Sequence, residues 1–223
     1  MDRSISIKML PFASLTMLFF AKGMDKEIRP ELKAVYKCLP VCYLIYYAIS
    51  NLKDSKKSKD YSKKIATGLV LSVIGDACIV WPKLFIPGAL AYILAHGAYA
   101  SSFGWKPLFL KTGIVLYSVV LTTVSAMVTQ LSTVLILAII IYALLLTTML
   151  WRAFARYIDS PNLWKLSALS GALLFLTSDI IFGIHLSYFQ IPHAEFVIMA
   201  IYYGAQLCIA LSCGEIVSLK KEA

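Results

Sequence analysis

The run from Thr112 to Trp151 contains no charged residue, and this absence restricts the fold of the chain more than any other feature. The run is much longer than the about 20 residues that one membrane-spanning helix needs, so it predicts two spans. Backbone groups inside a bilayer must be paired within the protein, and the alternating segments of a β-barrel, about ten residues each, do not occur in this sequence. Composition agrees, because 60% of the residues are hydrophobic and only 15% are charged. The sequence therefore predicts an all-α polytopic transmembrane bundle.

Window hydropathy predicts about eight helices. They cover residues 5–22, 33–51, 64–82, 84–104, 108–129, 132–151, 163–184 and 194–218. The first apolar run lacks a small-residue cleavage site, and we interpret it as a retained span. No linker interrupts the series, so residues 1–223 are predicted to form a single transmembrane helical domain.

The net charge of +9 is the next constraint, because it could indicate nucleic-acid binding. Most lysines and arginines instead fall in loops on one side of the predicted bundle, including the basic run from Lys53 to Lys64. The positive-inside rule places this side, with both termini, in the cytosol and next to anionic lipid. We therefore predict membrane lipids and no nucleic acid as partners.

Two aspartates stand alone among apolar residues. Asp76 follows Gly75 in the third predicted span, and Asp179 follows Ser178 in the seventh. An ionisable group inside a membrane is costly, so it usually faces a cavity and has a function. The surroundings predict one shared site, in which one carboxyl group is protonated while the other is ionised. The alternative is a structural ion pair of one aspartate with Lys37.

A weak internal similarity accompanies the two aspartates. An Ile-Pro dipeptide at 86–87 follows the first, and another at 191–192 follows the second. Each dipeptide leads into a helix that carries tyrosines. The pattern predicts a parallel four-plus-four repeat of spans.

Polar side chains recur at helical spacing on several predicted spans. The stripes are Tyr92, His96, Tyr99 and Phe103 on the fourth span, Glu195, Met199, Tyr202 and Gln206 on the eighth, and Tyr36, Pro40, Tyr43 and Tyr47 on the second. Such groups would be unsatisfied against lipid, so we expect them to face the bundle interior. They either converge on the aspartates or only hold helices together.

Other chemistries are less well supported by the residues present. A zinc site would need His96, His185 and His193 together, and their spacing is poor, so no metal is predicted. The five cysteines form no Cys-x-x-Cys pair. Arg152 and Arg156 end the sixth span, either as positive-inside anchors or as contacts for a lipid phosphate.

The ordered set of motifs resembles the lysoplasmalogenase, or YhhN-like, family of integral membrane proteins. The matching segments are Lys37-Cys-Leu-Pro40, Gly75-Asp76, Ala91–Tyr99, Trp151-Arg152-Ala153, Gly171–Asp179 and Tyr202–Gln206. They cover most of the chain, although Cys38 stands where family members have proline.

The resemblance implies hydrolysis of the vinyl ether bond of lysoplasmalogens. The products would be a fatty aldehyde and glycerophosphoethanolamine or glycerophosphocholine. Lysoplasmalogen and membrane lipids would be the partners, and no cofactor would be needed. The resemblance also implies the endoplasmic reticulum, where animal members are found.

The residues suit this chemistry, because a vinyl ether is protonated on carbon to give an oxocarbenium ion, which water then attacks. Such a reaction needs a proton donor and a carboxylate, as at glycosidic bonds. We predict Asp76 and Asp179 as the catalytic pair, without assigning the donor. The residues predicted to orient the pair, the water or the headgroup are Lys37, Tyr92, His96, Tyr99, Tyr202 and Gln206.

Three other functions stay open on the sequence. The first is a proton-coupled transporter of a small or lipid-like solute, which intramembrane carboxylates and a repeat suit equally well. The others are a non-catalytic lipid-binding or scaffold protein and a metal-dependent lipid amidase.

Overall fold

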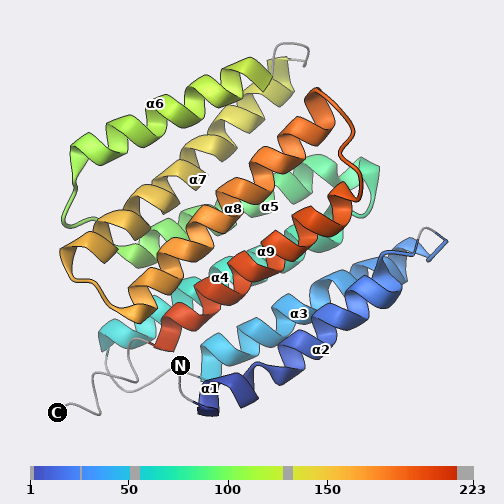
Figure 1. The fold of residues 1–223 in the computed structure, drawn as a ribbon, viewed down its shortest axis with the longest axis horizontal. Helices are drawn as coiled ribbons and strands as arrows, with labels where there is room; N and C mark the ends of the chain where they lie inside the picture. The colour runs from blue at the N-terminus through green and yellow to red at the C-terminus, as the bar shows by residue number, and fades with distance from the viewer. Residues whose placement is uncertain (1–2, 26, 51–55, 128–132, 215–223) are drawn as a thin grey trace.

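A computed structural model of the chain describes residues 3–25, 27–50, 56–127 and 133–214. Within these residues the chain forms helices joined by short connections, and no strand (Figure 1). The N-terminal half contains α1 (Arg3–Lys8), α2 (Leu10–Leu18), the π-helix η1 (Phe19–Gly23), α3 (Pro30–Ser50), α4 (Lys56–Cys78), the short 3-10 helix η2 (Pro82–Leu84) and α5 (Phe85–Phe103). The C-terminal half contains α6 (Leu110–Met127), α7 (Thr133–Asp159), α8 (Leu163–Ser187), α9 (Ala194–Leu211) and the 3-10 helix η3 (Ser212–Gly214). The helical bundle that the sequence predicts is confirmed.

Most helix boundaries fall near the predicted ones, and the exceptions have local causes. The first predicted span is divided into α1, α2 and η1, and the first turn of α2 contains a proline, Pro11, that cannot donate a backbone hydrogen bond. The sixth predicted span ends at 151, but α7 continues to Asp159. The last part of the eighth, residues 215–218, lies outside the described residues, as do Lys53, Lys220 and Lys221.

Five helices of the described chain are long and apolar enough to cross a membrane. They cover Pro30–Ser50, Pro82–Phe103, Ile136–Asp159, Leu163–Leu186 and Ala194–Gly214, and a shorter apolar helix covers Leu110–Ala126. The nine residues of α2 are too few by themselves, and the N-terminal turns of α4 are rich in lysine. The protein is therefore a multi-pass membrane protein.

Six of the described helices form a closed ring. Each of α3, α4, α5, α7, α8 and α9 packs against the next, and α9 returns to pack against α3. Helix α2 lies outside the ring against α3, and α6 lies outside it against α7 (Figure 1). Side chains that point inward from the ring are consequently shielded from lipid.

The two halves of the chain pack in the same order. In each half the first span lies outside on the second, the second packs on the third, and the third packs on the fourth. The fourth span of each half then contacts the second span of the other half, which closes the ring. This is the arrangement that a parallel four-plus-four repeat requires.

A buried arginine holds the connection between α5 and α6. Arg152 is fully buried and donates to the backbone carbonyl oxygens of Gly104 at 2.6 Å, Pro107 at 2.8 Å and Leu108 at 3.3 Å. Its guanidinium also lies 5.2 Å from the ring centre of Trp151. The hydrogen bonds of Arg152 therefore tie the start of this connection to α7.

Candidate active site

The carboxyl group of Asp76 is surrounded by donors from three other helices. Tyr92 of α5 donates to Oδ1 at 2.9 Å, and Tyr202 of α9 donates to Oδ2 at 2.5 Å. The ammonium of Lys37 on α3 lies 3.5 Å from Oδ1. The Asp76 side chain has no exposed surface. All three neighbours favour the ionised carboxylate, since each presents a hydrogen to it.

Local sequence explains how Asp76 is reached. Gly75 precedes it, and a Cβ at this glycine would lie 2.9 Å from the ring of Tyr92. The absence of a side chain at 75 thus lets α5 approach closely enough for Tyr92 to reach the carboxyl group. The ion pair with Lys37 that we considered as a structural alternative is present, but it is only one of three contacts.

Two further polar side chains hold Tyr202 in place. Gln206 lies one turn along α9 and donates from Nε2 to the Tyr202 hydroxyl at 2.9 Å. The hydroxyl of Tyr99 on α5 donates to Oε1 of the same glutamine at 2.9 Å. Tyr99 and Gln206 therefore do not touch Asp76 and act on it through Tyr202.

Asp179 has a simpler environment on α8. Tyr142 of α7 donates to its Oδ2 at 2.8 Å, and Nε2 of His96 on α5 lies 3.1 Å from the Tyr142 hydroxyl. Because the tyrosine proton is given to Asp179, the hydroxyl oxygen accepts from His96, which places the imidazole proton on Nε2. The Nδ1 atom of His96 is then an acceptor, and it is buried without a hydrogen-bond partner among the described residues.

Aromatic rings connect the two carboxyl environments. Phe175, one turn before Asp179 on α8, lies 5.2 Å from the His96 ring and 5.8 Å from the Tyr202 ring, centre to centre. Within the described residues, no hydrogen bond or ion pair joins Asp76 directly to Asp179. The structure thus arranges the predicted residues in two hydrogen-bond networks, one around each aspartate, and Phe175 packs against both.

Two groups of residues singled out from the sequence lie elsewhere. In the stripe of α3, Tyr43 donates to the backbone oxygen of Lys8 in α1 and not to either carboxyl group. His185 accepts at Nδ1 from the backbone of Ile191 and so holds the loop before α9. The described residues contain no cluster of three or more histidine, cysteine, aspartate or glutamate side chains that could hold a metal ion.

Comparison with known proteins identifies the family of the chain. The sequence profile of the YhhN family matches residues 32–213, which include every helix of the ring apart from the first two residues of α3. The chain belongs to the YhhN family. No solved structure matches it.

Characterised relatives of this YhhN chain align over nearly its whole length. Lysoplasmalogenase TMEM86B of Sus scrofa is 34% identical over 94% of this chain and 88% of its own length. Lysoplasmalogenase TMEM86B of Homo sapiens is 34% identical over 91% of this chain and 84% of its own. Lysoplasmalogenase TMEM86A of Bos taurus is 30% identical over 93% of this chain and 89% of its own.

Sequence reasoning missed Tyr142, although this residue makes the hydrogen bond to Asp179 that the structure describes. Tyr142 is one of two tyrosines in the uncharged run from Thr112 to Trp151. A hydroxyl on a ring in such a run needs a partner inside the protein, which is the signal that could have identified it.

Proposed function

We propose that this protein is a lysoplasmalogenase that hydrolyses the vinyl ether bond of lysoplasmalogens within the membrane. The products are a fatty aldehyde and glycerophosphoethanolamine or glycerophosphocholine. The observation that carries the proposal is the pair of intramembrane carboxyl groups, each held by hydroxyl donors inside the helix ring. The identity to lysoplasmalogenases over most of the chain supports the same reaction.

The reaction consumes one water molecule and returns its catalytic proton. A carboxylic acid gives a proton to the vinyl carbon farther from oxygen, which leaves an oxocarbenium ion on the carbon bound to oxygen. Water adds to that carbon and loses a proton to the conjugate carboxylate. The resulting hemiacetal breaks its bond to the glycerol oxygen, which takes a proton from the carboxylic acid, while the hemiacetal hydroxyl returns its own proton to the carboxylate and becomes the aldehyde. General acid–base catalysis of this kind typically contributes about 10²- to 10⁴-fold.

We assign the proton-donor role to Asp179. This carboxyl group accepts one hydrogen bond, at Oδ2, and Oδ1 makes none to the described residues. The residue is also half-buried, whereas Asp76 is fully buried. Oδ1 is therefore available to hold a proton and to deliver it to a substrate carbon.

Asp76 is assigned the role of a fixed negative charge. Its two oxygen atoms accept from Tyr92 and Tyr202 and face the Lys37 ammonium, so the carboxylate is held in one orientation. A preorganised charge stabilises a cationic intermediate without reorganising during the reaction. The oxocarbenium ion is the species that this charge would stabilise.

Tyr142 and His96 are assigned to positioning. Tyr142 orients Asp179, and the His96 Nε2–H orients Tyr142. The remaining imidazole nitrogen, Nδ1, accepts a hydrogen bond from the attacking water in this scheme, which would satisfy a buried acceptor.

The cellular setting belongs to the same proposal. We place the whole chain as one transmembrane domain in the endoplasmic reticulum, with both termini in the cytosol. The distribution of lysine and arginine supports this orientation. The partners are the lysoplasmalogen substrate and the surrounding lipids.

The decisive test uses the purified full-length protein with lysoplasmenylethanolamine in heavy water. Protonation on carbon predicts a fatty aldehyde that carries one deuterium on the carbon next to the carbonyl group, detected by mass spectrometry. A saturated 1-alkyl lysolipid is the matched control and should stay intact. Absence of aldehyde, together with solute flux in sealed vesicles, would favour the proton-coupled transporter that the repeated packing order also suits.

A further inference from the structure

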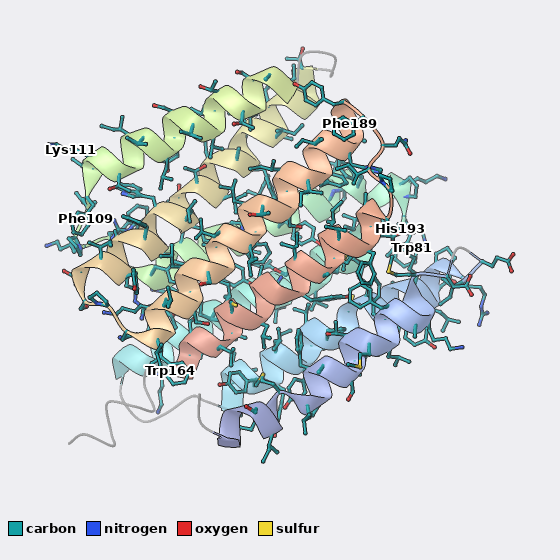
Figure 2. All side chains as sticks on the ribbon, viewed as in Figure 1. Trp81, Phe109, Lys111, Trp164, Phe189 and His193 are labelled. Atoms are coloured by element: carbon teal, nitrogen blue, oxygen red, sulfur yellow. The ribbon has the colours of Figure 1, made fainter. Side chains whose placement is uncertain are left out.

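A hollow opens at the end of the ring where α8 leads into α9. It measures about 550 Å³ and is lined by Met24, His185 and residues 192–196. Small-molecule sites typically occupy about 300–1,000 Å³, so the hollow can hold a polar headgroup. Figure 2 labels His193 and Trp81 at this end of the bundle, opposite Trp164 and Lys111.

An ion pair borders this hollow. The Lys33 ammonium lies 2.8 Å from Oε1 of Glu195, and the two side chains are 29% and 53% exposed. Both charges are thus accessible and stand side by side, with the positive charge on α3 and the negative charge on α9. A zwitterion that carries a phosphate and an ammonium presents the complementary pair of charges.

The ion pair lies in line with the carboxyl site. Lys33 precedes Lys37 by one helical turn on α3, and Lys37 contacts Asp76. On α9, Glu195 precedes Tyr202 by seven residues, which corresponds to about 10 Å along a helix axis. The ion pair and the buried carboxylate are therefore contacted from the same two helices, α3 and α9, at points one to two helical turns apart.

The dimensions of a lysolipid match the spacing between the ion pair and the carboxyl site. A short chain of single bonds, each about 1.5 Å long, links the vinyl ether oxygen to the phosphorus, and a similar chain links phosphorus to the ammonium nitrogen. Fully extended, these two segments span about 10 Å. A vinyl ether beside the carboxyl groups would place its headgroup at Lys33 and Glu195.

We propose that the hollow between α8 and α9, together with the Lys33–Glu195 pair at its border, is the headgroup subsite, in which Lys33 binds the lipid phosphate and Glu195 binds the ammonium. This inference rests on the proposed function and names the part of the substrate that the carboxyl site does not touch. Each charge of the ion pair exchanges one partner for another of the same sign, so binding leaves no charge unpaired. The site selects zwitterionic lysolipids over lipids that lack phosphate.

The first experiment measures binding without turnover. The full-length protein in detergent is titrated with 1-alkyl-glycerophosphoethanolamine, a saturated analogue, and with 1-alkylglycerol, which has the same tail and no phosphate. Wild type should bind the phosphate-bearing lipid more tightly. Lys33→Gln should weaken that binding about tenfold, the loss expected for a charge-assisted contact, and leave 1-alkylglycerol within twofold.

The second experiment follows aldehyde release from the corresponding 1-alkenyl lipids. Lys33→Gln should raise KM about tenfold for the glycerophosphoethanolamine substrate, with kcat retained. Glu195→Gln should raise KM about threefold for the same substrate. It should lower KM for 1-alkenyl-glycerophosphate, which has no ammonium. Lys83→Gln is the matched control, because Lys83 lies in the connection between α4 and α5 and is not the partner of Glu195.

The outcomes distinguish failure of the headgroup subsite from failure of the proposed hydrolase activity. Equal weakening of all lipids by Lys33→Gln would mean that the ion pair only ties α3 to α9, and would overturn the headgroup site. Equal affinity of wild type for the two alkyl lipids would overturn it as well. Phosphate-dependent binding that Lys33→Gln removes, in a protein that releases no aldehyde, would uphold the subsite and refute the hydrolase.

Discussion

Asp76 and Asp179 occupy matching places in the two halves of the molecule and yet have different surroundings. Each lies on the third span of its half, follows a small residue, and receives a donor from the preceding span of that half, Lys37 or Tyr142. Asp76 also accepts hydrogen bonds from Tyr92 and Tyr202 and is fully buried. Asp179 receives no further donor from the described residues and is partly exposed.

The difference shows how a repeated framework can supply two unlike carboxyl groups. The backbone position is set by the packing order of the spans, which both halves share. The state of each carboxyl group is set by the number and charge of its donors, which the halves do not share. In our scheme Asp76, whose carboxylate contacts three donors, is the fixed charge. Asp179, which has one donor among the described residues, moves the proton.

The largest expected effect is that of Asp179→Asn. The amide cannot donate an acidic proton, so we expect kcat for aldehyde release to fall at least about 10³-fold. Among the described residues no buried cation pairs with Asp179, so the melting temperature should change little. Wild-type turnover in this variant would refute the proton-donor assignment.

Asp76→Asn should lower turnover to a similar degree and should also destabilise the fold. It leaves the Lys37 ammonium buried beside a neutral amide, and removing one partner of a buried ion pair costs about 3–5 kcal/mol. Adding Lys37→Met should restore much of the thermal stability without restoring turnover. Equal melting temperatures for Asp76→Asn and Asp179→Asn would contradict the difference between the two sites.

Tyrosine-to-phenylalanine variants compare the donors themselves. Tyr142→Phe removes the one donor that Asp179 has among the described residues, and we expect kcat to fall about 30-fold with KM almost unchanged. Tyr92→Phe leaves Asp76 with Tyr202 and Lys37, and a loss of about fivefold is expected. Steady-state kinetics on both variants provides the check, and a larger loss for Tyr92→Phe would reverse the assigned roles.

The smallest effects should come from the residues that precede the aspartates. Gly75→Ala places a Cβ 2.9 Å from the Tyr92 ring, so the ring must shift and turnover should fall about threefold. Ser178→Ala removes only a 3.3 Å hydrogen bond to the backbone of Ile198, and near-wild-type turnover is expected. Loss of activity in Ser178→Ala with none in Gly75→Ala would show that the close approach of α5 is not needed.

The helical bundle could be predicted because lipid leaves a backbone few alternatives. Apolar runs and the missing charges between Thr112 and Trp151 were sufficient for it. The helices of the ring start and end within a few residues of their predictions, apart from the earlier start of α4, the later end of α7 and the earlier end of α9. Local sequence patterns do not predict such extensions. Whether a turn with charged residues is helical depends on its tertiary contacts, such as those of Arg152.

The site was predictable in its residues and less so in its arrangement. Both aspartates and the tyrosines of α5 and α9 could be identified, because isolated polar groups in apolar helices must find partners. Which donor reaches which carboxyl group depends on how the ring closes, and the contact between α9 and α3 has no signature in the sequence. Tyr142 was overlooked although its hydroxyl lies in an uncharged run and needs a partner inside the protein, and its positioning role, like the roles of the predicted site residues, is still a prediction.

The return of α9 to α3 also determines when the site can exist during synthesis. Spans enter the membrane in chain order, so Asp76 acquires its Lys37 partner early, when α3 and α4 are both inserted. Tyr202 arrives only with the final helix. A ribosome-bound intermediate is therefore catalytically silent, and activity first appears when the C-terminal helix has inserted beside the second span.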